Sequence, residues 1–199
     1  MSEPRVHRTE IGRRSLTTAV WGDGRPEIVL LHDGLGSVEQ WRDVPSAIAD
    51  RTGRTVLAYD RAGHGSSTPV PTGPWPARWL HHEATALSQL LSRLGAERPL
   101  LVGHSDGGSI ALLHEATSGG ASGVLTLAAH SWVEPRCVDA IADMRRDPRR
   151  VIAGLSRHHA HPVAVFEAWS GVWTSEEFRT WDIRPQLGAV SAPVWVVQG

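Results

Sequence analysis

The stretch PLLVGHSDGGSIALLHEA, residues 99–116, contains a serine between glycines at a change of pattern. The part that ends at Gly103 is a short apolar run without alternation, which is typical of a strand buried on both faces. The part from Asp106 to Ala116 has the apolar spacing of a helix. The sequence therefore predicts a sharp strand-to-helix turn with Ser105 at its tip.

Such a turn favours a nucleophilic role for Ser105. It holds the serine in a strained backbone conformation and raises the hydroxyl above the sheet. Side chains at positions 103 and 107, both glycine, would collide with neighbouring backbone, and the start of the helix adds partial positive charge. The alternative is a serine that only caps the helix. The buried strand that precedes Ser105 favours the nucleophile.

Runs with strand and helix character alternate along the chain, which predicts a mostly parallel sheet with helices on both faces. Strands are expected at 6–11, 15–21, 28–31, 55–59, 100–103, 123–129 and 194–197, and the first two should form a hairpin. Helices are expected at 38–51, 78–94 and 106–116.

Residues 132–190 differ from the rest, because they contain helix-like segments and no convincing strand. This is the position of a helical lid inserted over the ends of the strands. We therefore expect one domain over 1–199, with its core formed by 1–131 and 191–199. Most tryptophans of the inserted segment should simply pack, and Trp169 and Trp173 are candidates for lining a substrate pocket.

Composition narrows the class of protein. The chain has 199 residues and a formal net charge of −1, which gives no electrostatic indication of a nucleic acid or an anionic membrane as partner. Cys137 is the single cysteine, so no disulfide can form within the chain. There is no signal-peptide pattern and no apolar run of about 18 residues. A cytoplasmic protein is expected, and its oligomeric state is left open.

Three blocks of sequence, taken together, resemble the α/β-hydrolase family. They are LLHDGLGSVEQW at 30–41, YDRAGHGSS at 59–67 and VGHSDGG at 102–108, and they occur in the family's order. The resemblance implies the α/β-hydrolase fold, with a mostly parallel sheet, helices on both faces and an inserted helical lid. It also implies a hydrolase that needs neither cofactor nor metal. Esterases, lactonases, C–C bond hydrolases and cofactor-free haloperoxidases fit, whereas haloalkane dehalogenases carry aspartate in place of the serine.

The same resemblance assigns roles to individual residues. Ser105, in the nucleophile elbow, would attack a carbonyl carbon, and the backbone N–H of Asp106 would donate to the oxyanion. The second donor would come from the loop 32–36, from Gly34 or alternatively from Leu35, which is also a candidate for substrate binding. Three other residues, His32, Asp60 and His64, would position loops.

One departure from the family pattern is acidic. Asp33 replaces the usual second glycine of the loop, and Asp106 follows the nucleophile. Both carboxylates could belong to hydrogen-bonded scaffolding. The alternative hypothesis is that they lie at the mouth of the site and disfavour anionic substrates by charge repulsion.

The acid and the base that a serine nucleophile needs are harder to find. In this family the acid usually follows the strand represented here by 194–197, and the histidine comes later. We therefore expect both beyond Gly199, in a chain that is a fragment or a truncated product and lacks the last strand and helix of the fold. Glu134 is the one candidate for an acid within the chain. It is otherwise a surface residue at the entry to the lid.

No histidine after Ser105 has the position of the family's base. Those considered are His114, His130, His158, His159 and His161. The cluster at 158–161 has no cysteine or carboxylate at ligand spacing, so a polar loop is favoured over a metal site.

The leading hypothesis is a serine hydrolase that acts on a carboxylic ester or a related acyl bond of a small molecule. A catalytically inactive, truncated homologue that binds a small molecule is the alternative, and a pure interaction scaffold is a weaker third. Aspartate and histidine beyond Gly199 would decide between the first two.

Overall fold

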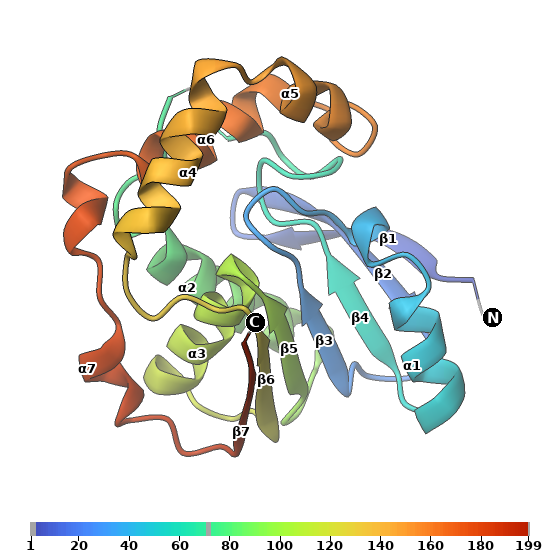
Figure 1. Ribbon diagram of the computed structural model, residues 1–199. Helices are drawn as coiled ribbons and strands as arrows, with labels where there is room; N and C mark the ends of the chain where they lie inside the picture. The colour runs from blue at the N-terminus through green and yellow to red at the C-terminus, as the bar shows by residue number, and fades with distance from the viewer. Residues whose placement is uncertain (1–2, 71–72, 199) are drawn as a thin grey trace.

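The computed structural model describes residues 3–70 and 73–198, and the expected domain bounds at 1 and 199 lie outside the described residues. Seven strands form one sheet in the order β1-β2-β4-β3-β5-β6-β7 (Figure 1). The strands are β1 (Arg5–Ile11), β2 (Arg14–Trp21), β3 (Ile28–Leu31), β4 (Val56–Tyr59), β5 (Leu100–His104), β6 (Gly123–Leu127) and β7 (Val194–Val197). β1 and β2 form the predicted hairpin, β2 is antiparallel to β4, and the other pairs are parallel. The mostly parallel sheet is thus confirmed.

Helices cover the sheet and its ends. They are α1 (Val44–Thr52), α2 (Trp79–Leu94), α3 (Asp106–Thr117), α4 (Pro135–Arg146), α5 (Arg149–Leu155), α6 (Pro162–Trp173) and α7 (Arg184–Leu187), with 3-10 helices η1 (Val38–Trp41) and η2 (Glu177–Thr180). α2 and α3 pack on one face of the sheet and α1 on the other (Figure 1). Among the described residues, no helix has the length and apolar character that crossing a lipid bilayer would require.

The sheet separates two apolar clusters, which explains why the inner strands β3 and β4 are continuous apolar runs. In β3, Val29 and Leu31 belong to the cluster under α2 and α3, whereas Ile28 and Leu30 belong to the cluster under α1. Successive side chains of a strand point to opposite faces, so a strand covered on both sides needs apolar residues at every position.

The expected single helix at 38–51 is wrong. The chain forms η1, breaks at Arg42, which has φ 51°, and starts again as α1 with Pro45 in its first turn. A positive φ cannot continue a right-handed helix. The Val38 N–H donates to Asp60 Oδ1 over 2.7 Å, so the short helix is also held by the loop after β4.

The segment between β6 and β7 contributes α4 to α7. Helices α4, α5 and α6 arch over one end of the sheet (Figure 1). The stretch that follows β6 is hydrogen-bonded to the stretch that precedes α7. The Val133 N–H donates to Trp181 O over 3.2 Å, and the Ile183 N–H donates to Ser131 O over 2.8 Å.

Strand β7 is an apolar edge of the sheet. It pairs with β6, and its side chains at Val194, Trp195, Val196 and Val197 are 39%, 54%, 67% and 54% exposed. All four are large apolar residues. Their exposure contrasts with β3 and β4, in which every residue is buried.

Candidate active site

Ser105 lies at the turn from β5 to α3, as the sequence predicts. Its backbone has φ 51° and ψ −120°, and the residue is half-buried. For a residue other than glycine this conformation is strained, and such strain is found where a structure holds a side chain in a required position. The Ser105 N–H donates to Leu127 O over 2.8 Å, which fastens the turn to the neighbouring strand.

The flanking glycines are required by close approach of backbone. A Cβ at Gly103 would lie 2.4 Å from the carbonyl carbon of Gly107, and a Cβ at Gly107 would lie 2.1 Å from Leu31 O. Both separations are far below a normal contact. The collisions expected from the sequence are therefore present, and they allow α3 to start directly against β3 and β5.

The loop after β3 presents its backbone beside this turn, and its hydrogen bonds favour one oxyanion donor over the other. The Leu35 N–H already donates to Asp33 Oδ1 over 2.9 Å. His32 Nδ1 donates to Asp33 O over 2.8 Å, and the Gly36 N–H donates to the same carbonyl over 3.2 Å. Because the Leu35 N–H is engaged inside the loop, Gly34 is the better candidate for the second donor.

A buried arginine that the sequence analysis did not single out holds this loop. Arg61 is 1% exposed, and its guanidinium donates to His32 O over 2.5 Å and to Asp33 O over 2.7 Å. Its backbone N–H donates to His32 Nε2 over 3.1 Å. A guanidinium has donors in a fixed fork, so it fixes two successive carbonyls at once.

His64 and Asp60 also position loops. His64 Nε2 donates to Gly34 O over 2.9 Å, and Asp60 Oδ1 accepts the Val38 N–H. Burial, assisted by the charge of Arg61, holds the pKa of His32 and of His64 well below the ordinary value. Neutral imidazoles bonded to backbone act as positioning groups.

The carboxylate of Asp106 is buried and does not line an acidic mouth. Asp106 is 1% exposed, and its Oδ2 accepts a hydrogen bond from Trp169 Nε1 over 2.9 Å. Burial raises the pKa of this carboxyl group. Asp33 is likewise engaged through its Oδ1. Asp106 therefore fits the scaffolding interpretation, whereas the Asp33 side chain is 35% exposed and its place in a charged mouth stays a prediction.

Trp169 covers the glycine proposed as an oxyanion donor. A Cβ at Gly34 would lie 2.0 Å from Trp169 Nε1 and 2.4 Å from Asp106 Oδ2. Position 34 therefore has no room for a side chain while α6 is docked. Leu35 is half-buried against the small cluster under α5 and α6. Trp173 is 1% exposed and packs in the main core, and its contact with substrate stays a prediction.

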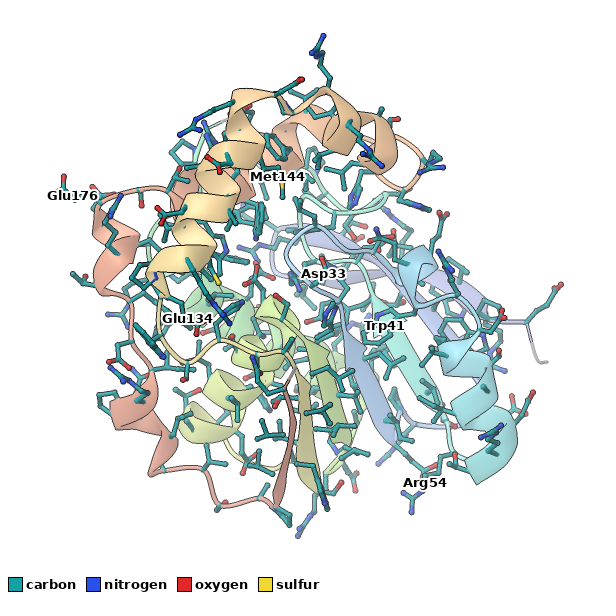
Figure 2. The ribbon with its side chains drawn as sticks, in the orientation of Figure 1. Asp33, Trp41, Arg54, Glu134, Met144 and Glu176 are labelled. Atoms are coloured by element: carbon teal, nitrogen blue, oxygen red, sulfur yellow. The ribbon has the colours of Figure 1, made fainter. Side chains whose placement is uncertain are left out.

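One exposed pair of side chains lies next to Ser105. His104 precedes Ser105, and its Nδ1 is 3.4 Å from Asp33 Oδ2, with the two side chains 47% and 35% exposed. Asp33 lies beyond the end of β3, on the side that the arch of helices covers (Figure 2). No sequence pattern indicates this pair, because the two residues meet only through the parallel pairing of β3 and β5.

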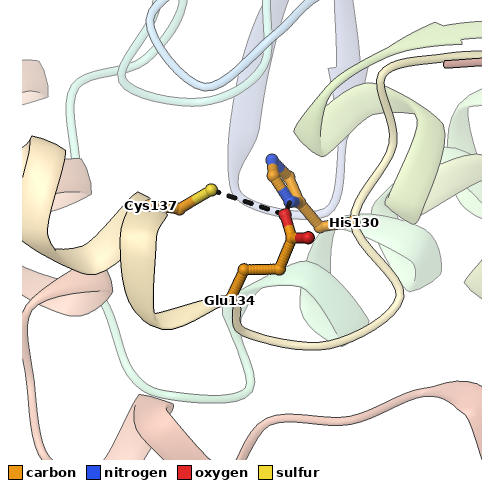
Figure 3. A group of neighbouring side chains, drawn as sticks. All are labelled: His130, Glu134 and Cys137. Atoms are coloured by element: carbon orange, nitrogen blue, oxygen red, sulfur yellow. Dashed lines mark hydrogen bonds and ion pairs between the residues drawn. The ribbon is translucent and has the colours of Figure 1, made fainter. Parts of the chain in front are cut away.

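Glu134 lies where β6 leads into α4, and it has two partners (Figure 3). Its Oε2 is 3.7 Å from His130 Nδ1 and accepts the Cys137 thiol over 3.5 Å. Three of the other histidines considered as bases bond elsewhere: His114 to Ser88, His158 to Glu39, and His159 to Gly65 and Leu35.

Comparison with known proteins agrees with this architecture. A model described as "Alpha/beta hydrolase family" matches residues 28–197. A proline iminopeptidase of Clostridium botulinum is 30% identical over 160 residues, which are 79% of this chain and 50% of that protein. The sn-1-specific diacylglycerol lipase ABHD11 of Mus musculus is 39% identical over 88 residues, 44% of this chain and 27% of that one. The matched region thus spans half or less of these relatives.

Solved structures show the same fold. E-2-(acetamidomethylene)succinate hydrolase superposes with a TM-score of 0.73 at 20% identity, over 97% of this chain and 80% of that one. A structure from a study of carboxylesterases of Nitrososphaera gargenis gives a TM-score of 0.73 at 18% identity, over 98% and 80%. The family model matches most of the chain, and the turn at Ser105 agrees with it. The chain therefore belongs to the alpha/beta hydrolase family.

Proposed function

We propose that this protein is a serine hydrolase that cleaves a carboxylic ester or a related acyl bond of a small molecule. The observation that carries the proposal is the backbone of Ser105, held at φ 51° between a buried strand and the start of α3. The names of the relatives, a lipase and an iminopeptidase, support acyl-bond cleavage as the class of reaction.

In this proposal the Ser105 hydroxyl attacks the acyl carbon, and the carbonyl oxygen becomes an oxyanion. The N–H groups of Gly34 and Asp106 donate to that oxyanion, and one such donor is worth about 10²–10³ in turnover. The leaving group departs with a proton, and water then releases the acyl group from Ser105. Glu134 is the acid that this chain itself offers, through its approach to His130.

The substrate would lie between the loop after β3 and helix α6. Leu35 and Trp169 come from these two elements, and Trp169 contacts both Gly34 and Asp106 through its indole N–H edge. We propose that these two side chains contact the acyl substrate, together with Trp173 if α6 moves on binding.

A fluorophosphonate tests the nucleophile, because an activated serine attacks its phosphorus, displaces fluoride and becomes phosphonylated, whichever ester is the natural substrate. We expect the full-length protein to be labelled, and peptide mass spectrometry to place the label on Ser105. Ser105→Ala should abolish labelling. Ser66→Ala, which changes an exposed serine on the loop after β4, should leave it intact.

A folded protein that is not labelled, or is labelled elsewhere, would overturn the proposal and favour the small-molecule binding protein. Labelling followed by hydrolysis of aryl esters would support it. Comparing a neutral ester with a carboxylate-bearing ester of similar size then tests charge selection. Because Asp106 is buried, Asp33 is the carboxylate that could repel an anionic ester. An interaction between two exposed, screened charges is worth roughly 1 kcal/mol, so we expect the hydrolysis rates of the two esters to differ by less than about tenfold.

A further inference from the structure

We infer that His130, Glu134 and Cys137 form a binding site for Zn²⁺ or a similar divalent cation (Figure 3). Each residue offers one ligand atom, and the three atoms all lie within 4.8 Å of one another. His130 and Glu134 are the pair named above in connection with the acid, so an ion bound here would replace that role of Glu134. The existence of the site does not depend on Ser105 being a nucleophile.

The distances suit a tetrahedral ion. The Glu134 Oε2 atom is 3.7 Å from His130 Nδ1 and 3.5 Å from Cys137 Sγ. With Zn–N and Zn–O bonds of about 2.1 Å and a Zn–S bond of about 2.3 Å, tetrahedral ligands lie roughly 3.4–3.6 Å apart. The two separations that involve Glu134 are thus already near those that the ion would impose, and the His130 and Cys137 ligand atoms lie within 4.8 Å of each other.

The donor set selects the class of metal. Imidazole, carboxylate and thiolate together suit Zn²⁺, whereas Mg²⁺ and Ca²⁺ prefer oxygen ligands only. Three protein ligands leave a fourth position for water, which is the arrangement of an open zinc site. The His130 and Glu134 side chains are 18% and 29% exposed, so a hydrated ion can reach them.

The backbone that carries His130 is fixed before any metal binds. Its N–H donates to Ser109 Oγ over 3.2 Å, and the same hydroxyl donates to its carbonyl over 2.6 Å. Ser109 is completely buried on α3. A ligand held in this way loses little conformational freedom when it binds the ion.

The other two ligands share one turn of backbone. Glu134 immediately precedes α4, and the Cys137 N–H donates to its carbonyl over 2.9 Å. The side chains also meet, because the thiol donates to Glu134 Oε2. On binding, the thiol gives its proton to solvent, and Zn²⁺ takes the place of that proton between sulfur and carboxylate.

Titration of the full-length, metal-free protein with Co²⁺ tests this directly, since Co²⁺ reports its ligands by absorption. We expect one equivalent to produce a near-ultraviolet thiolate-to-Co(II) charge-transfer band, and Zn²⁺ to abolish the band by displacement. Cys137 is the single cysteine of the sequence, so such a band has one assignment. Zn²⁺ should also raise the melting temperature, because it binds the folded state.

Two variants remove ligands and one serves as a control. Cys137→Ser should lose the charge-transfer band. Glu134→Gln should keep the band but bind Zn²⁺ at least about tenfold more weakly, because even the loss of a residue that only hydrogen-bonds to a metal ligand typically weakens binding by that factor. His158→Gln removes a different histidine–carboxylate pair, with Glu39 at 2.9 Å, and should bind like the wild type.

Circular dichroism of each variant checks that it is folded, and Glu134→Gln decides if Cys137→Ser does not fold. Absence of the band in the wild type would overturn the site. So would a Zn²⁺ affinity and a melting-temperature shift that are the same in the wild type and the folded ligand variants.

Discussion

The indole of Trp169 donates a hydrogen bond to the carboxylate of Asp106 over 2.9 Å, and so joins α6 to the residue after Ser105. The two residues are 63 positions apart in the chain. Asp106 Oδ1 has no hydrogen-bond partner among the described residues, so this indole is the side-chain donor on which the buried carboxylate depends.

Trp169→Phe should therefore destabilise the protein. It keeps most of the ring and removes the donor, which leaves both oxygens of a buried carboxylate unpaired at a cost of about 1–3 kcal/mol. Urea unfolding measures the loss. Trp132→Phe is the matched control, because Trp132 is 39% exposed and its change should be about 0.5 kcal/mol or less. Equal losses for the two variants would contradict the importance of the hydrogen bond.

Gly34→Ala should displace α6. The new Cβ would lie 2.0 Å from Trp169 Nε1, so either the indole or the loop has to move. We expect a loss of about 1–3 kcal/mol, as for overpacking elsewhere, together with a change in tryptophan fluorescence. Gly154→Ala, in α5 with open space around it, should be neutral or stabilising by up to about 1 kcal/mol. A stable Gly34→Ala protein with unchanged fluorescence would show that the contact is not tight.

Ser105→Gly should be more stable than Ser105→Ala. Both variants lack the hydroxyl, so their difference isolates the backbone, which has φ 51° at this position. Alanine keeps the backbone strain and glycine removes it, but glycine also gives the unfolded chain more conformational entropy. After both effects, we expect the free energy of unfolding of the glycine variant to be about 1 kcal/mol larger. Chemical denaturation of the two proteins compares them. The reverse order would mean that the turn is not strained.

Stability should fall in mild acid, in part through His159. Its Nδ1 accepts the Gly65 N–H, so Nε2 carries the proton that it donates to Leu35 O, and the ring is neutral. Burial lowers the pKa of His159 below its ordinary value of 6.5. The unfolded chain then binds the proton more readily, so this contribution is complete above pH 6.5 and is lost as the pH falls towards the folded-state pKa.

His159→Gln offers the same pair of hydrogen bonds without a titrating ring. Below pH 6.5 its free energy of unfolding should fall less steeply than that of the wild type, by up to about 1.4 kcal/mol per pH unit. Urea titrations at several pH values between about 5 and 8 give both slopes. Parallel curves would show that protonation of His159 is not coupled to unfolding.

The sheet and the turn at Ser105 were predictable because their signals are local. A strand buried on both faces must be apolar at every position, and the close approach at Gly103 and Gly107 excludes any side chain. The prediction of one helix over 38–51 was wrong because the local signal does not show the break at Arg42. Apolar spacing continues through Arg42, and only a tertiary contact, from Val38 to Asp60, shows that the chain bends there.

The supporting contacts of the site were not predictable in the same way. Arg61 looks like a solvent-exposed loop residue, yet it is 1% exposed because the carbonyls of His32 and Asp33 receive its guanidinium. The pair formed by Trp169 and Asp106 has no local signal either, since it depends on how α6 docks. Patterns in sequence report which face of an element is apolar, and they do not report which distant donor a buried oxygen meets.

The packing of Gly34, Asp106 and Trp169 limits how this fold could be redesigned. Anyone who exchanges α6 to change the substrate also removes the cover of the glycine and the donor for the carboxylate. The residues at these three positions therefore have to be exchanged together. A transplanted helix will be tolerated only if it carries a tryptophan at the position of Trp169, or if positions 34 and 106 are changed with it.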